Sequence, residues 1–97
     1  MMDIHVKEEY ISPIVKVIKW YLKTYKFDPM DEEWLKRVCN RFEEGKGNYI
    51  CAENELYLVK EAFSYAKSKG PQDGITPSEM NDIYTWLEEK YRNSQKQ

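Results

Sequence analysis

The sequence predicts an all-α fold, a compact single-domain bundle of about four helices. Apolar residues recur every three or four positions in four separate stretches, which is the spacing of an amphipathic helix. Most of the four glycines and four prolines stand between these stretches, where they end helices or form turns. The chain has 97 residues, enough for one hydrophobic core but not for two.

The first helix is expected to begin at Ser12 and Pro13 and to run to about Lys26. A serine oxygen can accept hydrogen bonds from the free N–H groups of a helix start, and proline suits the first helical position. The apolar residues on its predicted core face are Ile14, Ile18, Tyr21, Leu22 and Tyr25. Residues 1–11 are expected to form an N-terminal arm that either packs loosely or extends this helix backwards.

The second helix is expected to follow the break at Phe27-Asp28-Pro29, because the residue before a proline avoids the helical region. Asp28 or Asp31 can cap its start, and Gly45 and Gly47 are expected to end it. Its apolar stripe is Trp34, Leu35, Val38 and Phe42. Residues 48–53 predict either a short extended segment or an early helical turn.

The third helix is expected to run from about Asn54 to the break at Gly70-Pro71. It carries two neighbouring apolar stripes, and so wide an apolar arc is typical of a helix at the centre of a bundle. The first stripe is Leu56, Val59, Phe63 and Ala66, and the second is Leu58, Ala62 and Tyr65.

The fourth helix has the clearest start signal in the chain. Thr76 and Glu79 have the spacing of a capping box, Pro77 stands at the first helical position, and Ile75 can pack against Met80. The residues of its predicted core face are Met80, Ile83, Tyr84, Leu87 and Tyr91. Residues 93–97 are expected to be a polar tail.

The motifs that carry catalysis, metal binding or nucleotide binding are missing. His5 stands in the arm with no residue to orient it, so no catalytic triad can be argued. Cys39 and Cys51 are too few for a disulfide framework or a zinc site, and both are expected to be buried thiols. The segment around Gly74 lacks the acids of a calcium loop. We therefore expect no enzymatic activity, no metal and no cofactor.

Two features bear on location. The chain has no run of 18 apolar residues, so no transmembrane span is expected. Charged residues follow Met1 closely and interrupt any secretory signal. A cytoplasmic protein without membrane contact is the expectation.

The most specific surface feature is the segment 12–26, which has four lysines and no acid although the whole chain has a net charge of −2. At about 100° per residue, the lysines fall within roughly one quadrant of the helix, largely opposite its core face. They are Lys16, Lys19, Lys23 and Lys26. Trp20 flanks them, and Trp86 and Tyr57 lie off the core faces of their own helices, which favours an interface.

Three interpretations of the lysines are open. They can form an ordinary solvated face, a docking surface for an acidic protein with Trp20 as anchor, or a surface for nucleic-acid phosphates. We expect a non-catalytic binding protein, an adaptor or small inhibitor, that docks on a larger protein through these lysines, Trp20 and Trp86. A homodimer is the other protein partner considered. A nucleic-acid-associated protein using the same helix is the alternative function.

Overall fold

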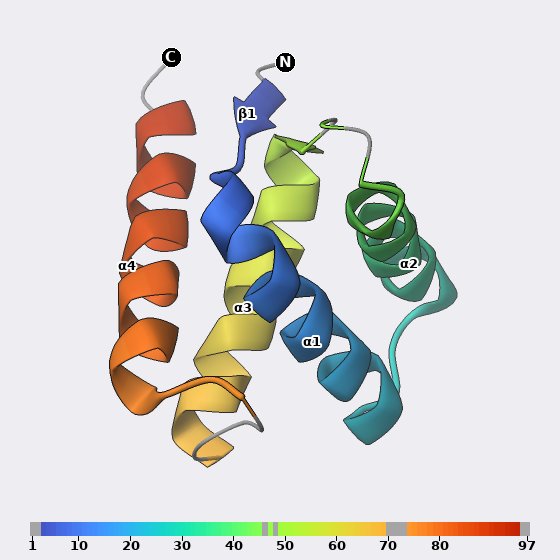
Figure 1. The fold of residues 1–97 in the computed structure, drawn as a ribbon. Helices are drawn as coiled ribbons and strands as arrows, with labels where there is room; N and C mark the ends of the chain where they lie inside the picture. The colour runs from blue at the N-terminus through green and yellow to red at the C-terminus, as the bar shows by residue number, and fades with distance from the viewer. Residues whose placement is uncertain (1–2, 46, 48, 70–73, 96–97) are drawn as a thin grey trace.

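Four helices and a two-stranded sheet make up the described part of the fold (Figure 1). The computed structural model describes residues 3–45, 47, 49–69 and 74–95. The elements in chain order are β1 (Asp3–His5), α1 (Glu8–Thr24), α2 (Pro29–Glu43), β2 (Ile50–Ala52), α3 (Glu53–Lys69) and α4 (Pro77–Ser94). The predicted all-α bundle is thus confirmed, with a small sheet in addition; an extended segment was one of the two alternatives predicted for residues 48–53.

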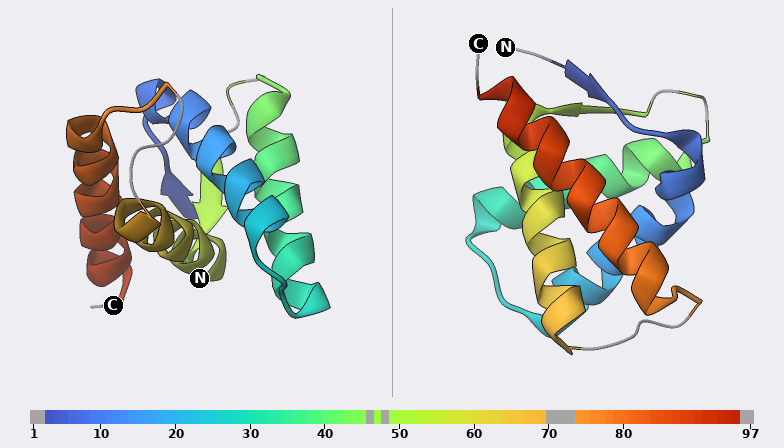
Figure 2. Two further views of the ribbon diagram at one scale, coloured as in Figure 1. Left: turned by 90° about the horizontal axis from the view of Figure 1, so that it is seen from below. Right: turned by 90° about the vertical axis from the view of Figure 1, so that its left-hand side faces the viewer.

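Helix α3 is the centre of the bundle, as its wide apolar arc predicts. It contacts the three other helices and both strands. Figure 2 shows α4 on one side of α3, and α1 and α2 on the other. The first predicted stripe is fully buried, but Tyr65 of the second stripe is 43% exposed. Tyr65 lies at the edge of the arc, where its ring meets Tyr21 and Tyr25 of the α1 segment instead of entering the core.

The predicted start of α1 at Ser12 and Pro13 is wrong. The helix begins at Glu8, and Pro13 lies inside it with a buried side chain. Proline leaves the carbonyl of Glu9 without its helical partner, but Glu9 is exposed, so water can take that place. Burial of Ile11 and Pro13 favours the longer helix, so residues 8–11 extend α1 backwards, as one of the two alternatives for the arm proposed.

The remainder of the described arm forms the small sheet. Strands β1 and β2 are antiparallel, with Asp3 opposite Ala52, Ile4 opposite Cys51 and His5 opposite Ile50. The central pair is buried on one face of the pleat. The backbone N–H of Val6 continues the ladder by donating to the Tyr49 carbonyl at 2.8 Å. The extended alternative for residues 48–53 therefore holds for Ile50–Ala52.

The predicted caps of α2 and α4 are present. Asp28 accepts a hydrogen bond from the Met30 N–H at 3.1 Å, and Thr76 Oγ1 accepts from the Glu79 N–H at 3.1 Å. After α2 ends, Gly45 adopts a φ of 65°, a left-handed conformation that suits glycine. Helix α4 continues to Ser94, into the predicted polar tail, and the Ser94 hydroxyl donates to the Tyr91 carbonyl at 2.7 Å. Residues 96–97 of that tail, like the predicted helix break at 70–71, lie outside the described residues.

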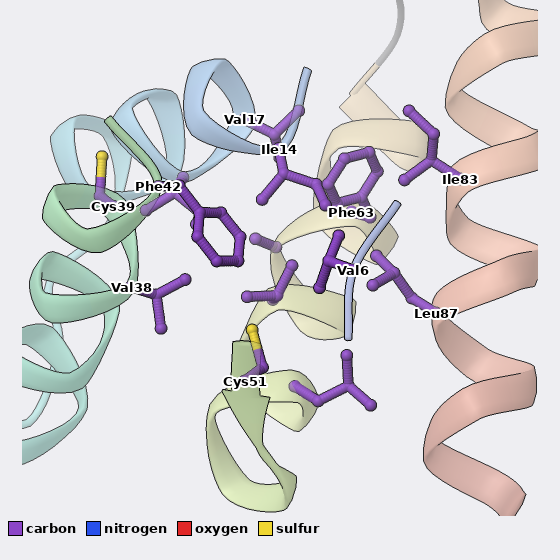
Figure 3. Close-up of a cluster of buried hydrophobic side chains, with 14 of the residues drawn as sticks. Val6, Ile14, Val17, Val38, Cys39, Phe42, Cys51, Phe63, Ile83 and Leu87 are labelled. Atoms are coloured by element: carbon purple, nitrogen blue, oxygen red, sulfur yellow. The ribbon is translucent and has the colours of Figure 1, made fainter. Parts of the chain in front are cut away.

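The hydrophobic core lies around α3 (Figure 3). Phe63 lies between Ile14 and Val17 of α1 and the α4 residues Ile83 and Leu87, and it is completely buried. Val38, Cys39 and Phe42 enter the core from α2, and Cys51 enters from β2. This core fixes the helices relative to one another, and the outer side of α1 faces away from it.

Candidate binding surfaces

The predicted lysines lie on the outer side of α1 and just beyond its end. Lys16, Lys19 and Lys23 are exposed on the helix, and Lys26 is exposed two residues after the helix ends at Thr24. We call these four residues the lysine face. Helix α1 crosses in front of α3 in Figure 1, and no other element covers its outer side in that view.

Lys19 is tied to the neighbouring helix. Its Nζ lies 2.7 Å from Glu43 Oε2 at the end of α2. This hydrogen bond raises the pKa of Lys19 and lowers the pKa of Glu43. The Cys39 thiol donates to the other carboxylate oxygen of Glu43 at 3.6 Å. The solvated-face interpretation therefore describes Lys19 well, because its charge is already paired within the protein.

The other lysines lack such a pairing. Within the described residues, Lys16, Lys23 and Lys26 form no ion pair. The longer α1 also places Glu8 and Glu9 in its first turn. Acids at the start and lysines towards the end of a helix complement its dipole, so part of this charge pattern stabilises α1 itself.

Trp20 does not project freely beside the lysines. It is half-buried, with its ring centroid 6.4 Å from that of Tyr21 and 5.9 Å from that of Tyr25. Phe27 and Tyr65 join the same group, with centroids 4.6 Å and 5.5 Å from that of Tyr21. Trp20 is therefore an ordered edge of an aromatic cluster, next to the lysine face.

Trp86 lies apart from Lys19, the lysine of the lysine face that is paired with Glu43. It packs edge-on against Tyr10 in the first turn of α1, with ring centroids 5.5 Å apart. Lys19 instead reaches α2, which lies on the opposite side of the molecule from α4 (Figure 1). The structure thus places Trp86 and Lys19 on opposite flanks of α1. Trp86 lies off the core face of its helix because it contacts Tyr10, a residue of the predicted N-terminal arm.

A second candidate surface was not foreseen from the sequence. An open groove of about 750 Å³ lies where the first turns of α2 and α3 meet the last turns of α4. The right-hand view of Figure 2 shows these three helix ends on one side of the molecule. The residues that line the groove are Met30, Asp31, Trp34, Glu53, Asn54, Tyr57, Leu58 and Tyr91. We call this feature the end groove.

The end groove holds two of the large apolar or aromatic side chains that are most exposed among the described residues. Met30 is 65% exposed and Tyr57 is 40% exposed. Tyr57 and Tyr91 lie with ring centroids 5.4 Å apart, and the Lys60 ammonium lies 5.4 Å from the first centroid and 5.6 Å from the second. A hydrogen bond to Glu61 raises the pKa of Tyr57. The off-stripe position of Tyr57 was the one sequence signal for this groove, whereas Trp34 was assigned to a core stripe.

Both cysteines are buried, and burial raises the pKa of Cys39 to about 11 and that of Cys51 to about 12, so both are protonated thiols near neutral pH. No cluster of three or more His, Cys, Asp or Glu residues in the described ranges could hold a metal ion. Among the described helices, none combines the length and the apolar character needed to span a membrane.

Comparison with models of protein families, with curated proteins and with solved structures gives no match to this chain.

Proposed function

We propose that this protein is a non-catalytic binding protein that docks on a larger, acidic protein partner through the lysine face. The observation that carries the proposal is the state of Lys16, Lys23 and Lys26, which are exposed and form no ion pair among the described residues. Unpaired cations on one uncovered helix side attract an acidic surface and steer its approach.

The residues around the lysines favour docking of a partner in one orientation. Trp20 is held by Tyr21 and Tyr25, so little side-chain freedom is lost when a partner covers its exposed edge. Glu8 and Glu9 at the other end of α1 repel acidic groups and give the face a direction. Trp86 is left out of the proposed surface, because it is half-buried against Tyr10.

The test uses charge reversal at lysines that form no ion pair among the described residues. Lys19 is unsuitable, because a glutamate there would meet Glu43. Lys16→Glu with Lys23→Glu reverses two exposed charges that lie on the same side of α1, about two turns apart. Lys69→Glu with Lys90→Glu makes the same change of net charge on α3 and α4, at exposed lysines that form no ion pair among the described residues, and is the matched control.

The partner is trapped by a photoreactive residue placed at Ser12, an exposed position on the outer side of α1. Extracts of the native cells are irradiated with and without prior treatment with nuclease. We expect one main protein adduct, retained by the control variant and reduced about tenfold by the Lys16/Lys23 variant, as loss of two charge pairs implies. The isolated partner should associate more slowly as salt rises.

Two results would contradict the proposal. An adduct of equal yield with the Lys16/Lys23 variant would show that the lysines are an ordinary solvated face. Loss of the adduct after nuclease treatment, together with binding of random duplex DNA whose affinity falls linearly with the logarithm of salt, would establish the nucleic-acid alternative.

A further inference from the structure

We infer that the end groove is a second binding site, which takes a basic peptide segment of another protein anchored by a large apolar side chain. The residues that line it come from α2, α3 and α4, and none comes from α1. The site is therefore separate from the lysine face, and each can be tested without the other.

The apolar part of the end groove suits a protruding side chain. Met30, Trp34, Tyr57 and Leu58 line it from two helices. Methionine adapts its shape to different apolar groups, and tryptophan and tyrosine are enriched among the residues that dominate interface energies. Burying Met30, which is 65% exposed, removes apolar surface from water and so favours binding.

The open shape favours a peptide over a small molecule. Small-molecule sites usually enclose most of their ligand. Here Met30 and Asp31 at one wall and Tyr57 at the other are exposed. A peptide can place one side chain between these walls while its backbone and its remaining side chains stay at the surface.

The charge of the groove indicates a basic ligand. Asp31 lies on the α2 wall and Glu53 on the α3 wall. Neighbouring acids of α2 are paired, Glu32 with Lys36 at 3.6 Å and Glu33 with Arg37 at 3.4 Å.

The two acids that line the groove have no such cation. Among the described residues, Asp31 and Glu53 form no ion pair, and the Gln95 amide that donates to Glu53 is neutral. Lys60, whose ammonium lies over the rings of Tyr57 and Tyr91, forms no ion pair with either acid. A lysine or arginine of the ligand would complete the charge balance of Asp31 and Glu53.

The test uses a 14-residue synthetic peptide of leucine and lysine with an amphipathic helical pattern. Its binding to the full chain is followed by fluorescence anisotropy and by ¹H–¹⁵N NMR spectra. We expect shifts centred on Met30, the Trp34 indole N–H and Tyr57. A peptide with glutamate in place of each lysine should not shift these signals.

Variants of the two groove acids, which form the charged rim of the groove, give the decisive comparison. Asp31→Lys with Glu53→Lys should weaken binding of the leucine-lysine peptide about tenfold, since two attractive rim pairs become repulsive. Asp82→Lys with Glu89→Lys makes the same change of net charge at exposed α4 positions that do not line the groove, and it should bind as the native protein does. Met30→Ser should also weaken binding, with the groove acids intact.

Should the charge-reversed rim variant fail to fold, Asp31→Asn with Glu53→Gln serves in its place and should weaken binding by a smaller factor. Equal affinity of the rim variant and the native protein would overturn the proposal. So would shifts that lie outside the groove, or equal binding of the glutamate peptide to the groove signals.

Discussion

Arg41 of α2 and Glu55 of α3 form a two-point ion pair at the end of the small sheet. Nη1 and Nη2 of Arg41 each donate to one carboxylate oxygen of Glu55 at 3.1 Å. Nη1 also donates to the carbonyl of Ile50 at 2.6 Å, and the N–H of Ala52 donates to Glu55 at 2.9 Å. Glu55 thus joins two helices and β2, and it bonds to the N–H before α3 as the glutamate of a capping box does.

The first prediction concerns acid stability. Burial alone would raise the pKa of Glu55, but the hydrogen bonds from Arg41 and Ala52 outweigh burial and hold this pKa below its ordinary value. A lowered folded-state pKa stabilises the fold at pH values above the unfolded pKa, and this contribution is lost as the pH falls through the folded pKa. Glu55→Gln should therefore cost about 1–3 kcal/mol at pH 7.

Urea unfolding of both proteins at several pH values measures this effect. The difference in the free energy of unfolding should shrink once the pH falls below about 4.3, the ordinary pKa of glutamate. Glu79→Gln, at an exposed position, is the control and should show a smaller change at every pH. A difference that stays constant down to pH 2 would mean that the charge of Glu55 contributes nothing.

The second prediction concerns the core. Phe63→Ala should lower the free energy of unfolding by about 3–5 kcal/mol, because it removes a large side chain from a closed site and leaves a cavity. Phe63 is completely buried between α1 and α4. Tyr65→Ala, two residues later and 43% exposed, should cost less. Denaturant melts decide, and a cost below about 1 kcal/mol for Phe63→Ala would contradict the central place of α3.

The third prediction concerns the start of α4. Thr76→Ala removes the oxygen that accepts from the Glu79 N–H and should cost about 1 kcal/mol. Thr76→Ser keeps that oxygen and should retain most of the stability. Thermal melts of the two variants test the cap, and equal losses would show that the hydroxyl is not what stabilises this helix start.

The fourth prediction concerns the thiols. Burial raises the pKa of Cys51 to about 12 and that of Cys39 to about 11, so neither is a thiolate at pH 8. Iodoacetamide should label both cysteines only as fast as the protein opens, and quickly in denaturant. Mass spectrometry of timed samples gives the rates. Rapid labelling of Cys51 in native protein would place it at the surface, against its 1% exposure.

The fifth prediction separates two residues of the lysine face. Lys19→Glu should lower the melting temperature more than Lys23→Glu, because the new carboxylate would face Glu43, the present partner of Lys19. Lys23 has no ion pair within the described residues. Raising the salt concentration should reduce the difference, since screening weakens exposed charge interactions. Identical melting temperatures at low salt would mean that the pair with Glu43 does not stabilise the fold.

The sequence by itself determined the features that depend on neighbouring residues. Four helices, the caps at Asp28 and Thr76 and the exposed lysines of α1 follow from side chains within a few positions of one another. The central place of α3 also follows, because a helix with an apolar arc on two sides must be covered on both.

Only the tertiary structure decided what depends on distant segments. Pairing with Ile50–Ala52 makes Asp3–His5 of the predicted arm a strand. Burial of Pro13 inside the helix accompanies a start of α1 at Glu8, earlier than predicted. The end groove and the contact between Arg41 and Glu55 likewise join residues from separate elements. A helical or strand pattern records which side of an element is apolar, but it does not record which other element that side will meet.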